Sequence, residues 1–299
     1  MKRFLIYFRD PSLFLVALVT KCNFLFPDKL YLQILFRLKM GYKLNLNNPQ
    51  TFSEKLQWLK LYDRNPEYIK MVDKFLVKEY VANKIGPEHV IQTIGVWDSP
   101  DAIDWDCLPN QFVLKVTHGG GNCGVVICKD KKSFDKQTAL KKIKRGWRQN
   151  LFATSREWPY KYVKHRIIAE KYMEDSVTKE LRDYKFFCFN GEVKALFIGT
   201  ERQKQGEDVK FDFFDADFNH LCLRQGHDSA KKCPEKPQSF EQMKSFASIL
   251  SKGMPHVRVD LYEVNGNVFF GEMTFYHFGG MVRFKPEEWD MIFGKWLVL

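Results

Sequence analysis

Four glycines lie within seven residues in the segment His118-Gly-Gly-Gly-Asn-Cys-Gly124. The spacing matches the G-x-G-x-x-G of dinucleotide-binding loops, but that motif needs a helix after the glycines, and a strand-like run follows here. No Gly-Lys-Ser/Thr ending and no G-x-S-x-G elbow accompany it, which excludes a P-loop and an esterase site. A hairpin tip with so few side chains allows backbone N–H groups to bind phosphate oxygens, although an ordinary surface hairpin remains an alternative.

A lysine precedes these glycines inside an apolar strand. Lys115 is flanked by Val113, Leu114 and Val116. A buried ammonium group is costly unless an anion pairs with it, and beside a glycine hairpin a phosphate is the natural anion. Lys115 and the glycine segment together therefore favour a site for nucleotide phosphates.

Two carboxylates occupy a predicted hairpin near the C-terminus. Alternation places Arg258 and Asp260 on one face of the first strand, and Glu272 and Thr274 on one face of the second. A turn at Asn265-Gly266 would bring Asp260 opposite Glu272. Two facing carboxylates repel unless a cation lies between them, and hard oxygen ligands suit Mg²⁺. A surface Asp and Glu paired with Arg258 is the alternative.

Length and composition limit the kind of protein. The 299 residues are enough for one compound domain or two to three lobes, and 45% hydrophobic residues indicate a globular chain. The 47 Lys and Arg against 36 Asp and Glu give a net charge of +11, without any run of five like charges that would indicate nucleic-acid binding. Seven cysteines without a C-x-x-C pair predict reduced thiols in the cytoplasm.

The N-terminus resembles a signal peptide only superficially. Arg9 and Asp10 interrupt the pattern before the apolar run 13–19, which is too short to cross a bilayer. We expect residues 1–46 to form a helical segment that packs on the core, with contact to the inner membrane face as the alternative.

The remaining elements indicate an α+β fold. Thr51 and Glu54 form a capping box that begins a helix, and a second helix is expected from Pro66 to Val81. Further helices are expected over 133–152 and 240–252, and strands over 89–95, 111–117, 124–128, 166–170, 183–189, 192–198, 256–262 and 268–274.

From about Asn47 to the C-terminus, the chain resembles the ATP-grasp enzymes of the TupA-like group, which are associated with teichuronopeptide and capsular polysaccharide synthesis. The resemblance rests on six ordered strings: Asn48-Pro-Gln-Thr-Phe-Ser-Glu-Lys-Leu-Gln-Trp-Leu-Lys60, Val72-Asp-Lys-Phe75, Arg156-Glu-Trp-Pro-Tyr160, Asp183-Tyr-Lys-Phe-Phe-Cys-Phe-Asn-Gly191, Val257-Arg-Val-Asp-Leu-Tyr262 and Pro286-Glu-Glu-Trp-Asp290.

The resemblance implies an ATP-grasp fold, in which two lobes of antiparallel sheet and helices grip ATP. Four segments are expected: a helical N-terminal segment 1–46, a mainly helical lead-in 47–107, a first lobe with the glycine flap 108–170, and a second lobe with the metal-binding hairpin 171–299. The nucleotide-binding residues implied are Lys74, Lys115, His118, Gly119, Gly120, Gly121, Asn122, Glu170, Lys171, Met173, Asp183 and Lys185.

The resemblance also implies roles around the transferred phosphate. Arg258 would stabilise the oxyanion of the tetrahedral intermediate and Lys115 would reach the phosphates. Asp260 and Glu272 match the Mg²⁺ ligands. Thr274 stands where the general pattern has a metal-ligating Asn, so the second metal site is a departure from the family.

The activity implied is an ATP-dependent carboxylate–amine ligation through an acyl phosphate, with Mg²⁺ required. The expected substrates are a uronic acid of a surface polysaccharide or its precursor and an amine, and the polysaccharide-synthesis machinery is a possible partner. One alternative is a glycosyltransferase, for which Asp215-Ala-Asp217 is the one D-x-D candidate. Another is a polysaccharide-binding protein without catalysis, which would tolerate the loss of Lys115 and Asp260.

A basic stretch with interleaved aromatics runs from residue 141 to residue 166. It contains Arg148 and Arg156, with Trp147, Trp158 and Tyr160 among the charges. Sugar rings stack on aromatic faces and uronate carboxylates pair with Arg and Lys, so this stretch is a candidate groove for an acidic saccharide. A solvated helix face with core aromatics would give the same sequence.

Overall fold

The computed structural model describes residues 11–177, 179, 181–200 and 209–299. The expected interruption at Arg9 and Asp10, and the start of the N-terminal segment, lie outside these residues. The first third of the described chain is helical, as predicted. Its helices are α2 (Pro11–Lys21), α3 (Asp28–Met40), α4 (Phe52–Tyr62), α5 (Glu67–Val72) and α6 (Val77–Ile85), with short 3₁₀ turns η1 (Asn23–Leu25) and η2 (Pro87–His89).

The capping box at the start of α4 is confirmed. The Thr51 side chain accepts a hydrogen bond from the backbone of Glu54, and the Glu54 carboxylate accepts one from the backbone of Thr51. Both satisfy N–H groups that the first helical turn leaves free. The helix also holds the C-terminus, because Lys55 donates to the carbonyls of Gly294 and Leu297.

The single helix expected from Pro66 to Val81 is wrong, because Asp73 divides it into α5 and α6. Asp73 is fully buried, and its Oδ1 accepts from the backbone N–H groups of Phe75 and Leu76. A side chain that bonds backbone groups in this way competes with the helical ladder. The apolar spacing continues across the break, which is why periodicity alone did not show it.

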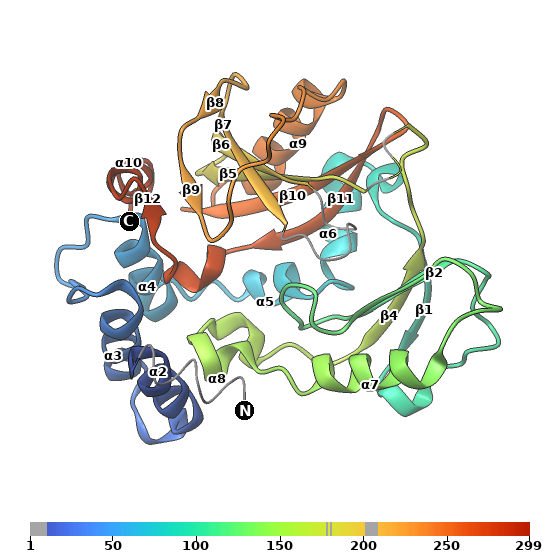
Figure 1. Ribbon diagram of the computed structural model, residues 1–299, viewed down its shortest axis with the longest axis horizontal. Helices are drawn as coiled ribbons and strands as arrows, with labels where there is room; N and C mark the ends of the chain where they lie inside the picture. Colours follow the sequence, from blue (N-terminus) through green and yellow to red (C-terminus); the bar gives the residue numbers. More distant parts are fainter. Residues whose placement is uncertain (1–10, 178, 180, 201–208) are drawn as a thin grey trace.

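A four-stranded antiparallel sheet follows, in the order β1-β4-β2-β3. Its strands are β1 (Thr93–Trp97), β2 (Phe112–Val116), β3 (Val125–Cys128) and β4 (Ile167–Lys171). Helix α7 (Lys136–Trp147) packs against it, with Ala139 and Ile143 buried against Leu114 (Figure 1). The first strand lies later than the expected 89–95, and the helix expected over 133–152 is divided into α7 and α8 (Leu151–Ser155).

The second sheet has six antiparallel strands in the order β11-β10-β5-β6-β7-β8. They are β5 (Asp183–Phe189), β6 (Glu192–Thr200), β7 (Lys210–Asp215), β8 (His220–Leu221), β10 (Val257–Val264) and β11 (Asn267–Thr274). Helix α9 (Phe240–Ser251) covers one face, and phenylalanines such as Phe186 and Phe187 are fully buried in the core. The Asn190-Gly191 and Asn265-Gly266 turns close hairpins as predicted, with positive φ at all four residues.

The remaining elements are 3₁₀ turns η3 (Pro100–Ala102), η4 (Trp158–Lys161) and η5 (His277–Gly280), the pair β9 (Arg224–Gln225) and β12 (Phe284–Lys285), and α10 (Glu288–Trp296). The chain is α+β, as predicted, and a cavity lies between its two sheets. Strand β1 of the first sheet lies before residue 108, where the first lobe was expected to begin. The expected domain boundaries at residues 46, 107 and 170 stay predictions. Within the described residues, no helix is both long and apolar enough to cross a membrane.

Candidate nucleotide-binding site

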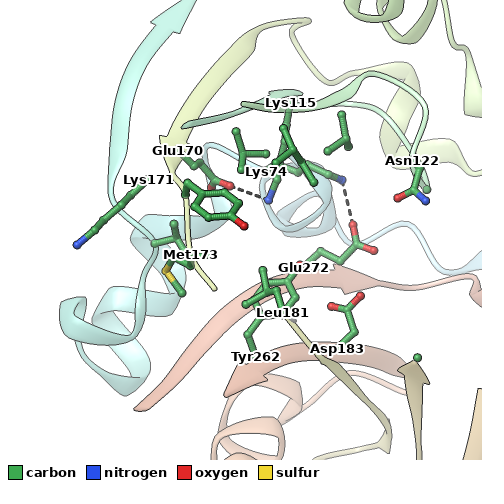
Figure 2. Close-up of a pocket in the computed structure, with 18 of the residues that line it drawn as sticks. Lys74, Lys115, Asn122, Glu170, Lys171, Met173, Leu181, Asp183, Tyr262 and Glu272 are labelled. Carbon is green, nitrogen blue, oxygen red and sulfur yellow. Dashed lines mark hydrogen bonds and ion pairs between the residues drawn. The ribbon is translucent and has the colours of Figure 1, made fainter. Parts of the chain in front are cut away.

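A cavity of about 510 Å³ lies between the two sheets (Figure 2). Ten of the sixteen residues assigned to the site from the sequence line it: Lys74, Lys115, Gly121, Asn122, Glu170, Lys171, Met173, Asp183, Lys185 and Glu272. They come from the α5–α6 break, from the first sheet and its hairpin, and from the second sheet. The fold thus brings together residues that are up to 198 positions apart.

Lys115 reaches the cavity because of the alternation of β2. Phe112, Leu114 and Val116 are buried in the core beneath the sheet, so Val113 and Lys115 point to the opposite face and line the cavity. Lys115 Nζ lies 2.7 Å from Glu170 Oε2. Burial opposes the charge on Lys115, but the Glu170 carboxylate outweighs it and raises the lysine pKa.

Glu170 lies on β4 between two cations. Lys78 Nζ is 2.6 Å from its Oε1, and Lys115 approaches the other oxygen. Burial would raise the pKa of Glu170, but the two ammonium groups lower it below the usual range. Glu170 was assigned from the family pattern to the adenine edge; here its carboxylate holds the two lysines. Lys171 and Met173, which follow Glu170 in the chain, line the cavity.

The break at Asp73 positions Lys74. The backbone N–H of Lys74 donates to the carbonyl of Thr117 at 3.1 Å, which ties the break to the end of β2. Its Nζ donates to the Gly119 carbonyl at 2.8 Å and to Glu272 Oε2 at 3.0 Å (Figure 2). One side chain therefore links the lead-in helices, the glycine segment and the last hairpin.

The glycine segment contributes backbone at its tip and a buried anchor at its base. Gly121 and Asn122 line the cavity. The segment packs so tightly on α7 that a Cβ on Gly146 would lie 2.3 Å from Gly124 Cα. Three residues assigned to nucleotide binding do not line the cavity, namely His118, Gly119 and Gly120.

His118 is an anchor beneath the glycine segment. It is 2% exposed, its ring stacks on His165 with centroids 3.5 Å apart, and its Nε2 lies 3.2 Å from the Trp147 carbonyl. Burial lowers the pKa of His118 to about 4, and His165 and Lys74 add to this effect. The ring thus stays neutral near pH 7 and fixes the base of the segment to α7.

Asp260 and Glu272 are opposite partners across β10 and β11, as the alternation predicted. Arg258 holds both oxygens of Asp260, with Nε and Nη2 each 2.7 Å away, and Lys185 pairs with Asp260 as well. Arg258 Nη2 also donates to Thr274 Oγ1 at 3.0 Å. Asp260 is fully buried, so the alternative of a surface Asp paired with Arg258 does not hold for it.

Glu272 is the more open carboxylate, with its side chain 30% exposed. Burial would raise its pKa, but Lys74, Lys185 and Arg258 lower it far below the usual range. Asp260, Glu272 and the Thr274 hydroxyl offer the oxygen donors that Mg²⁺ prefers, so these residues fit the ion. Within the described ranges, no group of three or more His, Cys, Asp or Glu side chains converges, so further ligands would have to be phosphate or water oxygens.

The prediction that Arg156 belongs to a groove for an acidic saccharide is wrong. This residue is 4% exposed, and its guanidinium holds Asp28 at 2.8 Å and the carbonyls of Asn23 and Phe26. It therefore fastens α3 and the preceding turn to α8. Sequence alone could not reveal this role, because the partners lie more than 120 positions away.

Two kinds of residue were missed. The first is the apolar lining of the cavity, which includes Ile91, Val125, Ile127, Leu181 and Tyr262. For Val125 and Ile127, the period-two pattern of β3 was the available signal. The second is His277, which is 1% exposed. Its Nδ1 lies 2.7 Å from Arg258 Nη1 and its Nε2 lies 3.0 Å from Gln225 Oε1. No pattern in the sequence indicated that contact.

Several solved structures are similar to the chain. A D-alanine–D-alanine ligase of Helicobacter pylori is 14% identical, with 75% of this chain and 59% of that chain covered and a TM-score of 0.41. The D-alanine–D-alanine ligase of Bacillus anthracis complexed with ATP is 13% identical, with 68% and 53% covered and a TM-score of 0.40. The ADP complex of PurK, an N5-carboxyaminoimidazole ribonucleotide synthetase, is 13% identical, with 81% and 56% covered and a TM-score of 0.44.

The chain therefore spans less than two thirds of the length of each of these structures. No curated protein matches the sequence. The family model described as TupA-like ATPgrasp matches residues 54–298, which include β1 to β12 and the whole cavity. The chain belongs to the TupA-like ATP-grasp family.

Proposed function

We propose that the protein is an ATP-dependent carboxylate–amine ligase that acts through an acyl phosphate. The observation that carries the proposal is the cluster of the Arg258, Asp260 and Glu272 side chains. Glu272 of this cluster lines the cavity together with Lys74, Lys115 and Lys185. Alternating lysines and carboxylates of this kind can exchange their internal pairs for phosphate oxygens and a divalent cation.

In the proposed reaction, ATP binds between the sheets, with its base on the apolar lining and its phosphates toward Lys74, Lys115 and the glycine tip. Asp183 would hold the ribose and Lys185 would contact phosphate. Asp260, Glu272 and Thr274 would hold Mg²⁺, which would neutralise charge on the transferred phosphoryl group. The substrate carboxylate attacks the γ-phosphorus and ADP leaves, and the amine nitrogen then displaces phosphate from the acyl carbon.

Arg258 has the assigned role in the second step. Its guanidinium would donate hydrogen bonds to the oxyanion that forms when the amine adds to the acyl carbon. The bonds to Asp260 and His277 fix its orientation in advance, so little reorganisation is needed. No protein nucleophile takes part in this scheme.

We further propose that the carboxylate belongs to a uronic acid of a surface polysaccharide or its precursor, that an amino acid or other amine accepts it, and that the reaction occurs in the cytoplasm. The polysaccharide rests on the resemblance to the TupA-like group. The seven free thiols support a reducing compartment. The four segments 1–46, 47–107, 108–170 and 171–299 are kept as the proposed domain organisation.

The structure gives the D-x-D motif, on which the glycosyltransferase alternative depends, a different explanation. Asp215 Oδ1 accepts from the backbone of Asp217 and Asn219, so this carboxylate closes the turn between β7 and β8. Asp217 is 83% exposed and lies outside the cavity lining. A turn therefore explains the motif without a nucleotide-sugar.

The decisive experiment measures ADP release from Mg-ATP with glucuronate or galacturonate and a panel of amino acids. We expect ADP only when carboxylate and amine are both present, together with an amide product of matching mass. Mg-ATP alone should raise the melting temperature, because a ligand that binds only the folded state stabilises it. Sugar transfer from a nucleotide-sugar without ADP formation would overturn the proposal.

A further inference from the structure

An apolar surface is concentrated in the first thirty residues. Seven of the seventeen exposed large apolar side chains in the described part of the chain lie in this short region. We name them the N-terminal apolar patch: Leu13, Phe14, Leu15, Leu18, Phe24, Leu25 and Leu30, with Phe24 77% and Leu25 65% exposed. Exposed apolar side chains gathered in one short segment are typical of a contact site.

The patch exists because most residues of α2 are apolar and several of them are exposed. Val16 and Val19 of this helix contact the cluster around Tyr31 and Leu32. The described part of the N-terminal segment therefore packs on the core, as expected from the sequence. The exposed residues of α2 include Leu13, Leu15 and Leu18, with Lys21 at its end, and so many exposed apolar residues are atypical of a solvated surface helix.

The surroundings of the patch are basic. Residues 11–46 contain five Lys and Arg and one acidic residue, Asp28. Asp28 pairs with Arg156, which neutralises it. Lys21 and Lys29 are exposed and lie within the patch segment. The face thus combines apolar side chains with an excess of positive charge.

We propose that α2 and the following turn dock the protein on the surface of an anionic lipid bilayer. The apolar side chains would enter the boundary between headgroups and acyl chains, and the lysines would lie at the level of the anionic headgroups. The described part of α2 spans 11 residues, fewer than the about 20 that a membrane-crossing helix needs, and the proposed contact is interfacial. Charge complementarity selects a bilayer over a second copy of this chain, which carries the same positive face.

The docking surface is separate from the nucleotide site. Helices α2 and α3 stand at one end of the molecule, and the sheet of β1, β2 and β4 stands at the other (Figure 1). No residue of the patch lines the cavity. The proposal therefore does not rest on the proposed ligase activity, and catalysis in solution should not depend on it.

Co-sedimentation of the full chain with phosphatidylcholine vesicles, with and without phosphatidylglycerol, tests the proposal. We expect binding to the anionic vesicles, and a fall of about tenfold or more for Phe24→Glu with Leu25→Glu. Val298→Glu is the matched control, because Val298 is also 77% exposed and lies at the other end of the chain. It should bind like the unaltered protein.

A second pair, Lys21→Glu with Lys29→Glu, separates charge from apolar contact. This pair should weaken binding to anionic vesicles, and added salt should have the same effect. Melting temperatures close to that of the unaltered protein would establish that all variants fold. If the double variant at Phe24 and Leu25 does not fold, the double variant Leu15→Ser with Leu18→Ser replaces it in the vesicle experiment. Unchanged binding in the patch variants would overturn the proposal. The proposal would also be overturned if the unaltered protein bound no vesicles and instead formed a dimer that the patch variants dissociate.

Discussion

Lys74 Nζ lies 3.0 Å from Glu272 Oε2, and this contact joins the lead-in helices to the last hairpin of the second sheet. The same ammonium group holds the Gly119 carbonyl. Lys74 therefore sets the position of the glycine segment relative to the carboxylate that would hold Mg²⁺.

We expect Lys74→Met to weaken ATP binding by about ten- to a hundredfold, because a charge-assisted hydrogen bond contributes about 1.5–3 kcal/mol. Isothermal titration with Mg-ATP measures the change. Lys70→Met is the matched control, since Lys70 lies one turn earlier, is 62% exposed and pairs with the exposed Glu67. Equal effects in both variants would mean that Lys74 does not contact the nucleotide.

The sequence was sufficient for features that depend on local chemistry. Alternation and the Asn265-Gly266 turn placed Asp260 opposite Glu272, and the structure has that register. The capping box at Thr51 is likewise a short-range pattern. Such features depend on residues within about a dozen positions, so their geometry follows from backbone rules alone.

Features that depend on distant partners could not be predicted. Asp73 interrupts a helix whose apolar spacing continues, and its buried side chain also faces Arg166 at 3.5 Å. His118 carries the sequence signature of a phosphate-binding loop, yet its ring is covered by His165, 47 positions later. For both residues, the local sequence fits a structural role and another role equally well, and only tertiary packing decides between them.

Glu272→Gln should abolish ADP release while largely preserving ATP affinity. The substitution keeps the shape but removes one charged oxygen ligand, whose effect is greatest in the transition state, so kcat should fall at least about a hundredfold. ADP release and Mg-ATP titration measure the two quantities. Asp260→Asn should act in the same direction, but it also removes the buried negative charge that Arg258 and Lys185 share, so its melting temperature should fall as well. Near-normal turnover in both variants would refute the metal assignment.

His277 should act as a positioning residue for Arg258. Because Nδ1 accepts from Arg258, the ring proton lies on Nε2 and is donated to Gln225 Oε1. His277→Leu removes the acceptor at a cost of about 1–3 kcal/mol, so kcat should fall about ten- to a hundredfold with little change in KM for ATP. His277→Asn retains an acceptor near Nδ1 and should recover part of the rate. A parallel loss of ATP affinity, or no recovery in His277→Asn, would indicate a purely structural role.

The burial of His118 should make the protein sensitive to mild acid. An unfolded histidine titrates near its ordinary pKa of about 6.5, whereas burial beneath the glycine segment lowers the pKa of His118 to about 4. Between these values the unfolded chain binds a proton that the folded chain does not. Stability therefore rises with pH through this window, and it is lost as the pH falls from 6.5 toward 4.

Urea unfolding at pH 7 and pH 5 measures this effect. We expect the unaltered protein to lose roughly 1–2 kcal/mol more than His118→Gln between these two values, because the variant has no ring to protonate. His220→Gln is the control, since His220 is partly exposed and lies on β8, away from the glycine segment. Buried groups away from His118 titrate equally in all three proteins, so the difference reports on His118 and on the His165 ring stacked on it. If His118→Gln and the unaltered protein lose the same stability, the ring is not held neutral by its surroundings, and the anchoring role of the His118–His165 stack is wrong.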